Sequence, residues 1–430
     1  MQSYKIIREL VSFKKYLDLC NMNLRIVIIG LVFPEPTSSA AGWRMLQLIE
    51  QLKQISSDIH FACAATKSES SFPLETLDVT EHTVVLNDVS FDEFIAELKP
   101  EIVLYDRFMI EEQFGWRVKQ QFPDILTILD TEDLHFLRRA RTSAFKNNAS
   151  LDLDTTDCYR ELSSIYRSDL SIVISKVEYD LLKDQFQIPE NQLLYLPFLE
   201  DEITEDQFKA FPSFKERKDL MFIGNFIHEP NYQTVLQLKK VWNRIKKRIP
   251  NIELHIYGAY PPQKVLQLHN EKEGFIIKGK AENVNEIMKN YRILAAPIPF
   301  GAGLKGKFID GFKNGLPNVT TKIGAEGMIA ETWGGLIAEN EEDFVNEIVN
   351  LYSNEILWNE LQKNGKRIIN EQFSKVEWNG ILSNRIQELI KNLTNHRANL
   401  FVQKIIWQNQ LQATKYMSLW IEAKNNKLDK

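Results

Sequence analysis

Short apolar segments alternate with longer amphipathic segments along most of the chain. The first apolar segment, residues 24–33, is a nearly continuous run of Ile, Val and Leu, which is typical of a central parallel strand buried on both faces. A loop of small residues, 34–42, and an amphipathic helix near 43–52 follow it. Further strands are predicted at 58–64, 82–86, 102–105, 125–129, 170–175 and 193–197, with helices at 91–98, 111–121 and 177–186. This alternation predicts βαβ units and a parallel sheet.

A second series of the same kind begins near residue 220. It predicts strands at 220–224, 252–258, 275–279, 293–297, 318–321 and 335–338, with helices at 232–249, 284–291, 344–352, 357–373 and 378–393. The fold class is therefore α/β, with two doubly wound, Rossmann-like domains facing each other across a cleft. Because ligands of such sheets bind beyond the carboxyl ends of the strands, we expect the loops at 34–42 and 301–303 to face each other there.

The change in pattern also predicts how the chain is divided. Residues 199–218 are rich in charge and show little periodicity, which indicates a linker. The predicted segments are an N-terminal extension (1–21), a first domain (22–198), the linker (199–218), a second domain (219–375), a helix (376–395) and an amphipathic tail (396–430). The aromatic residues of the tail are expected to pack against the protein, and the tail is a candidate oligomer contact.

Composition excludes several classes of protein. Hydrophobic residues make up 44% of the chain and charged residues 26%, as in ordinary soluble globular proteins. The formal net charge of −6 leaves no basic excess for general nucleic-acid binding. Cys20, Cys63 and Cys158 match no metal-ligand spacing and fit a reducing compartment, so we expect a cytoplasmic protein without a bound metal or cofactor. No apolar run is long enough to span a bilayer. Residues 1–21 are either an amphipathic helix lying on a partner or a membrane, or an extension upstream of a start at Met22.

The segment at 300–317, FGAGLKGKFIDGFKNGLP, carries the most specific chemistry. It is predicted to join a buried strand to a helix through a glycine turn, which directs free backbone N–H groups and the positive helix end toward one point. That arrangement suits a phosphate. Lys305 and Lys307 stand at the same end, and Asp310, one turn further, is placed to accept hydrogen bonds from a sugar hydroxyl. The alternative is a solvated helix start with two surface lysines.

With these residues in view, the chain resembles the group-1 (family 4) glycosyltransferases of the GT-B fold over roughly residues 24–390. The likeness is strongest at FIGNFIHEPN (222–231), at PIPFGAGLKGKFIDGFKNGLPNVTT (297–321) and at IGAEGM (323–328). The segment at 373–382 resembles the family's helix that crosses back to the first domain. The resemblance implies transfer of a hexose from a nucleotide-diphosphate sugar to a glycan, a lipid-linked sugar or a protein, usually with retention and without a metal.

The resemblance also implies roles for particular residues. The leaving diphosphate gains negative charge, which Lys305, Lys307 and the backbone of Gly303 and Gly306 are expected to stabilise. Asp310 occupies the position of a glutamate that binds the ribose of the donor.

Other donor contacts are implied on both sides of the cleft. Gly42 matches the family's glycine loop that closes over the diphosphate from the first domain. Gly224 and Asn225 follow the first strand of the second domain, where the family lines the donor cleft.

His135 completes the candidate catalytic set with Lys305 and Asp310, because the family often places a histidine there that approaches the donor sugar. Its alternative is a helix-start histidine bound to Asp133 or to solvent. Glu326, in the IGAEGM loop, is a further sugar-contact candidate, with a capping or surface acid as the alternative. His228 has no assigned role.

The chain departs from the family pattern in two places. Most relatives carry two glutamates eight residues apart before G-x-P, and here Ala302 occupies the first position. The basic residues that often follow the first strand of the second domain are not evident in FIGNFIHEPN, and Lys305 and Lys307 are expected to compensate. Two alternatives stay open: a catalytically silent nucleotide-sugar-binding partner of another transferase, and a GT-B sugar-nucleotide epimerase, for which no convincing set of acid/base carboxylates is visible.

Overall fold

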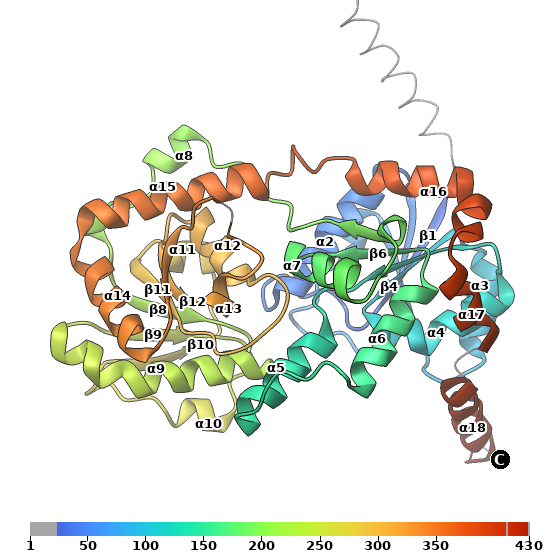
Figure 1. The fold of residues 1–430 in the computed structure, drawn as a ribbon, viewed down its shortest axis with the longest axis horizontal. Coiled ribbons are helices and arrows are strands. Elements are labelled where there is room, and N and C mark those ends of the chain that lie inside the picture. The colour runs from blue at the N-terminus through green and yellow to red at the C-terminus, as the bar shows by residue number, and fades with distance from the viewer. Residues whose placement is uncertain (1–23, 330, 410–411, 429–430) are drawn as a thin grey trace, which may run out of the picture.

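A computed structural model describes residues 24–329, 331–409 and 412–428 of the chain (Figure 1). It contains two parallel sheets, each covered by helices. We call the part built on the seven-stranded sheet the first domain and the part built on the six-stranded sheet the second domain. None of the described helices is both long and apolar enough to cross a membrane. The predicted N-terminal extension lies outside the described residues.

The first domain has the strand order β3-β2-β1-β4-β5-β6-β7. Its strands are β1 (Arg25–Gly30), β2 (Asp58–Cys63), β3 (Val79–Thr83), β4 (Ile102–Asp106), β5 (Leu126–Asp130), β6 (Leu170–Val173) and β7 (Leu193–Tyr195). Its helices are α2 (Ala40–Leu52), α3 (Ser90–Leu98), α4 (Phe108–Gln121), α5 (His135–Asn147), α6 (Thr156–Arg167) and α7 (Lys176–Asp180), which continues into one π-helical turn.

The second domain has the strand order β10-β9-β8-β11-β12-β13. Its strands are β8 (Lys218–Ile223), β9 (Leu254–Tyr257), β10 (Phe275–Gly279), β11 (Tyr291–Ala296), β12 (Asn318–Thr321) and β13 (Gly335–Ala338). Its helices are α9 (Glu229–Arg248), α10 (Gln263–Leu266), α11 (Val284–Met288), α12 (Gly306–Lys313), α13 (Lys322–Ala325), α14 (Glu341–Ser353) and α15 (Glu355–Gln372).

The central strand β1 shows why its sequence is apolar without interruption. Ile26 and Ile28 belong to a core cluster on one face of the sheet. Val27 and Ile29 belong to a separate cluster on the other face. Both faces are therefore buried, as predicted for a central parallel strand.

The edge strand β3 lies earlier in the chain than predicted. Residues 82–86 were expected to form it, but β3 pairs with β2 from Val79 opposite Ile59 to Thr83 opposite Cys63. Because β2 ends at Cys63, the residues after Thr83 have no partner strand, and Val85 is 55% exposed.

The predicted linker is more structured than its composition indicated. It contains α8 (Glu205–Lys209) and a 3-10 turn (Phe214–Glu216). Phe208 and Phe214 pack against the core of the second domain. Arg217 is buried and donates hydrogen bonds to backbone carbonyl oxygens of that domain. The end of the predicted linker is therefore attached to the second domain.

The C-terminal helices return to the first domain (Figure 1). Helix α16 (Ile381–Ala398) places Leu382, Ile386 and Leu389 in a core cluster of the first sheet, which confirms the crossover helix. It is followed by α17 (Phe401–Asn409) and α18 (Gln412–Leu428), which contact α6 and α4.

Candidate active site

A cleft of about 740 Å³ lies between the two sheets. It is lined from the first domain by the loops after β1, β4 and β5, and from the second domain by the loops after β8, β9, β10 and β11. All seven loops leave the carboxyl ends of parallel strands, where ligands of doubly wound sheets bind. The two predicted loops do face each other, since residues 36–41 and 301–303 line the same cleft from opposite domains. At the start of α12, a Cβ atom built on Gly306 would lie 2.8 Å from Cβ of Ala40.

Two lysines stand at the beginning of α12 in this cleft. The Nζ atom of Lys305 donates to the carbonyl oxygen of Gly303 at 2.9 Å, and that of Lys307 donates to Oδ1 of Asn231 at 3.0 Å. Lys305 is 8% exposed, so it is not a surface lysine. Burial lowers the pKa of each lysine to about 8. Among the described residues, neither has a carboxylate oxygen within 4.0 Å, so an anionic ligand would meet two unpaired ammonium groups.

Asp310 lies one turn further along α12 and also lines the cleft. Burial raises its pKa to about 6, against the opposing effect of the Lys313 ammonium nearby. Lys313 is itself paired with Glu200, between Nζ and Oε2 at 2.5 Å. Asp310 is therefore ionised at neutral pH and has a free carboxylate facing the cleft, which suits hydroxyl groups of a ligand.

The glycine turn before α12 is held by the first domain. The N–H of Gly303 donates to Oε1 of Glu178 at 2.6 Å, and Arg141 donates to the carbonyl oxygen of Gly301 at 2.7 Å. This corrects the prediction that the N–H of Gly303 is free for a phosphate. Burial raises the pKa of Glu178 to about 7. These contacts could not be predicted from the sequence, because Glu178 is 125 residues away from Gly303.

His135 is the first residue of α5 and lines the cleft at 6% exposure. Its Nδ1 lies 3.0 Å from the carbonyl oxygen of Asp133. Burial lowers its pKa to about 4, so the imidazole is neutral at neutral pH. A proton on Nδ1 that is donated to this carbonyl leaves Nε2 as a hydrogen-bond acceptor. His135 therefore contacts Asp133, as the alternative interpretation predicts, and it also lines the cleft, while its contact with a donor sugar stays a prediction. His228 also lines the cleft, and burial lowers its pKa to about 4.

Gly224 and Asn225 line the cleft from the second domain. The side-chain amide of Asn225 donates to the carbonyl oxygen of Ser38, across the cleft, at 3.3 Å. A Cβ atom built on Gly224 would lie 2.6 Å from the side chain of Asn231, which explains the glycine.

Gly42 and Glu326 do not line the cleft. A Cβ atom on Gly42 would lie 2.4 Å from the backbone of Glu35, so this glycine allows the loop after β1 to pack against the start of α2. The preceding residues, 38–41, line the cleft instead. Glu326 accepts two hydrogen bonds from Arg141, at 2.6 and 2.9 Å. The geometry therefore gives neither residue a contact with a ligand in the cleft.

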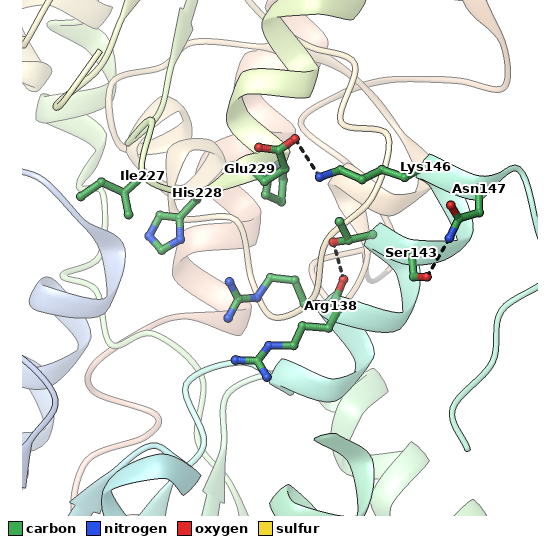
Figure 2. A pocket seen from close by; sticks show the side chains of 10 residues that line it. Arg138, Ser143, Lys146, Asn147, Ile227, His228 and Glu229 are labelled. Carbon is green, nitrogen blue, oxygen red and sulfur yellow. Dashed lines mark hydrogen bonds and ion pairs between the residues drawn. The ribbon is translucent and has the colours of Figure 1, made fainter. Parts of the chain in front are cut away.

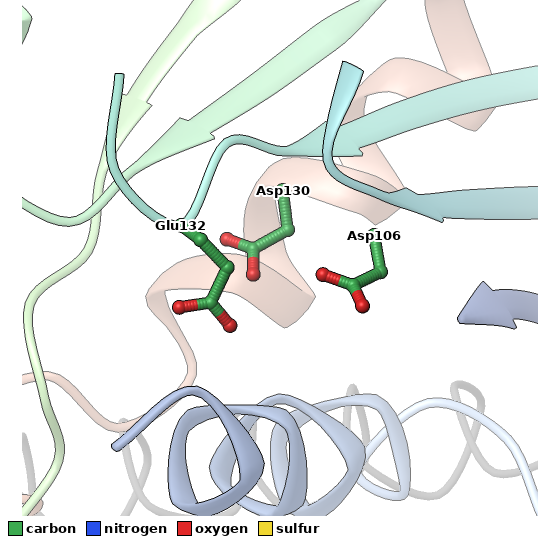
Figure 3. A group of neighbouring side chains, drawn as sticks. All are labelled: Asp106, Asp130 and Glu132. Atoms are coloured by element: carbon green, nitrogen blue, oxygen red, sulfur yellow. The ribbon is translucent and has the colours of Figure 1, made fainter. Parts of the chain in front are cut away.

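Three acids that sequence reasoning missed lie at the ends of β4 and β5 (Figure 3). Oxygen atoms of Asp106, Asp130 and Glu132 lie within 4.8 Å of one another, and this donor set could hold a cation. Arg44 and Arg107 already supply positive charge, at 3.5 Å from Asp130 and 3.6 Å from Asp106. Burial raises the pKa of Asp130 to about 6 and raises that of Glu132 well above its usual range. Asp106 ends β4, whereas the other two acids stand at the end of β5, so no sequence spacing predicts that the three lie together.

A second pocket of about 510 Å³ opens beside the cleft, between α5 and the loop before α9 (Figure 2). It shares Arg138 and His228 with the cleft. Its cations have acidic partners: Lys146 lies 3.3 Å from Glu229, and Arg138 lies 2.7 Å from Asp133. The pocket is therefore polar without a strong excess of charge.

Comparisons with known proteins agree with this architecture. Residues 217–354 match the family model described as glycosyl transferases group 1. An uncharacterized 44.6 kDa protein in the cps region of Klebsiella pneumoniae is 26% identical over 214 residues, which cover 48% of this chain and 53% of that protein. The match thus spans about half of the length of this curated relative.

Two solved structures show the same fold over nearly their whole lengths. Sucrose-phosphate synthase from Thermosynechococcus elongatus has a TM-score of 0.63 at 15% identity and covers 86% of this chain and 99% of its own. HepE from Anabaena in complex with UDP has a TM-score of 0.64 at 11% identity and covers 85% of this chain and 100% of its own. The second domain thus matches the model of the group-1 glycosyl transferases, and the chain shares its two-domain fold with these solved structures.

Proposed function

We propose that this protein transfers a hexose from a nucleoside-diphosphate sugar to a glycan, a lipid-linked sugar or a protein. The observation that carries the proposal is the pair of lysines at the start of α12, Lys305 and Lys307, which lack carboxylate partners among the described residues and lie one turn before Asp310. The complex of HepE with UDP supports a uridine nucleotide as the first donor to test.

In the proposed reaction, the anomeric C–O bond breaks and the diphosphate leaves with increased negative charge. The two ammonium groups and the positive end of α12 stabilise that charge, which is the change that most lowers the barrier. Asp310 binds the ribose hydroxyls of the nucleotide, and the neutral imidazole of His135 contacts the donor sugar. Independence of metal ions belongs to this proposal, because the lysines supply the charge that a metal would otherwise provide. Retention of configuration also belongs to it, as the family resemblance implies.

A catalytically silent nucleotide-sugar-binding protein is the second candidate. It is favoured by Ala302, whose methyl group stands where most relatives carry the first acid.

One experiment separates the two candidates. The protein is mixed with UDP-, GDP- and ADP-sugars, its thermal unfolding is followed, and free nucleoside diphosphate is measured with and without candidate acceptors. A donor that raises the melting temperature and is consumed in the presence of an acceptor supports transfer, whereas stabilisation without any release supports the silent alternative. The same assay in EDTA tests metal independence: activity that is lost and then restored by Mg²⁺ or Mn²⁺ contradicts it. Lys322→Ala is the matched control for lysine variants, since the Lys322 side chain is 75% exposed.

A further inference from the structure

Each of the two C-terminal helices turns a polar residue toward the protein and several apolar residues toward solvent, although Trp407 of α17 donates a hydrogen bond to the carbonyl oxygen of Arg167. On α17, Gln403 is 4% exposed and donates to a backbone carbonyl oxygen at the end of α6, whereas Phe401 is 72% exposed. On α18, Ser418 is 2% exposed and forms a hydrogen bond to the loop before α3, whereas Trp420 is 60% exposed. A helix that packs by its apolar side has the reverse arrangement. The prediction that the aromatic residues of the tail pack against the protein is therefore wrong for Phe401 and Trp420.

The outward side of these helices forms one kind of surface, which we call the tail face. Its residues repeat the spacing i, i+1, i+4 on both helices, which places them on one side of each helix. They are between 42% and 72% exposed: Phe401, Val402, Ile405, Tyr416, Met417 and Trp420. Figure 1 shows α17 and α18 at the end of the molecule farthest from the second domain. Exposed apolar surface that is concentrated in this way marks an interaction site.

In the described parts of α17 and α18, the exposed charged residues are lysines. Lys404 and Lys424 are exposed beside it, and Nζ of Lys424 lies 5.4 Å from the centre of the Trp420 ring. Glu422, the one acid within the described parts of these helices, turns inward and lies 3.0 Å from Arg117. A second copy seated on this face would bring lysines toward lysines. An anionic surface would complement them.

We propose that the tail face binds the surface of a membrane that contains anionic phospholipids. Tryptophan and tyrosine side chains favour the level of the headgroups, and the aliphatic residues reach the boundary of the acyl chains. The lysines contact the lipid phosphates, which attract basic residues near the surface. This contact is interfacial and does not depend on the proposed transferase activity.

The test is sedimentation of the full chain with vesicles of phosphatidylcholine alone and of an equal mixture of phosphatidylcholine and phosphatidylglycerol. We expect binding to the mixed vesicles that weakens at high salt. The double variant Phe401→Glu/Trp420→Glu should lower the partition coefficient by roughly tenfold or more. Ile356→Glu is the matched control, because Ile356 is 83% exposed on α15 in the second domain, and it should bind as the wild type does. Thermal unfolding verifies that each variant is folded.

Three results would overturn the proposal. The first is absence of wild-type binding to the anionic vesicles at low salt. The second is a double variant that binds like the wild type, or loss of all binding through Val11→Glu alone, which would assign the contact to the N-terminal segment. The third is a concentration-dependent dimer that the double variant abolishes while vesicles remain unbound, which would assign the tail face to a second copy.

Discussion

A close contact between the two domains, at Gly306 and Ala40, can be tested by adding one methyl group to Gly306. A Cβ atom on Gly306 would lie 2.8 Å from Cβ of Ala40, about 1 Å inside ordinary carbon–carbon contact. Gly306 begins α12, where alanine is a favourable residue, so Gly306→Ala creates no conflict within the second domain. Separation of the domains relieves the clash. Overpacking of this kind costs about 1–3 kcal/mol. Here it raises the free energy only of the arrangement in which the two domains are in contact.

Gly306→Ala should therefore lower turnover of a nucleotide sugar by about 5- to 150-fold while leaving the melting temperature unchanged or slightly higher. Small-angle scattering should show a larger radius of gyration. The rescue is Gly306→Ala with Ala40→Gly, because the nearest atom of residue 40 is then Cα at 3.9 Å, an ordinary contact. Gly279→Ala is a useful contrast, since its φ of +75° strains any side chain there and no atom outside the adjacent residues lies within 4 Å of the added Cβ, so its cost does not depend on domain position.

The double variant decides the interpretation. Turnover that recovers to within roughly threefold of the Ala40→Gly single variant locates the effect in the contact between the domains. Turnover that stays low in the double variant places the damage within α12 and refutes the reasoning. Wild-type turnover in Gly306→Ala would mean that the domains do not approach this closely during the reaction.

Further predictions concern charge. Lys305→Ala should lower turnover by about 100-fold or more, since one contact to a developing oxyanion is worth on the order of 3 kcal/mol, and unchanged kinetics beside the Lys322→Ala control would exclude the phosphate role. The kcat/KM of a nucleotide sugar should fall below about pH 6, where Asp310 becomes protonated, and above about pH 8, where Lys305 and Lys307 lose their protons. Asp310→Asn should remove the acid limb and weaken the preference for ribonucleoside over deoxyribonucleoside diphosphates, and a variant that keeps both features identifies Asp310 as a helix acid only. Asp130 has a pKa raised to about 6 in the folded state, so the native protein binds more protons between its ordinary pKa and that value. The free energy of unfolding should therefore fall as pH rises through this window, and urea titrations of Asp130→Asn should show a smaller fall, because Asp310 and Glu178 also have raised pKa values.

Contiguous features were predictable from the sequence. The strands are buried on both faces and so are unbroken apolar runs, as in β1. Lys305 and Asp310 stand within one short segment, in which the glycine turn and the start of the helix follow each other directly in the sequence.

Features made by distant parts of the chain were not predictable. Glu178 and Arg141 reach the glycine turn only because the domains meet. The extent of helix α5 was not predicted beyond the alternative that made His135 a helix-start residue, since the buried residues of α5 are confined to its first half and most of the rest are polar. The tail was predicted to be amphipathic, but periodicity does not tell which side of a helix faces the protein. Gln403 and Ser418 form hydrogen bonds to the protein, so that a polar position of each helix is buried.

The attachment of the glycine turn to the opposite domain has an energetic consequence. The contacts of Gly301 and Gly303 with α5 and α7 exist only while the domains are together. Any ligand that favours this arrangement from the first domain therefore also favours an ordered donor loop in the second. Under the proposed function, thermodynamic reciprocity requires that an acceptor that favours this arrangement tighten the binding of the donor by the same factor as the donor tightens that of the acceptor.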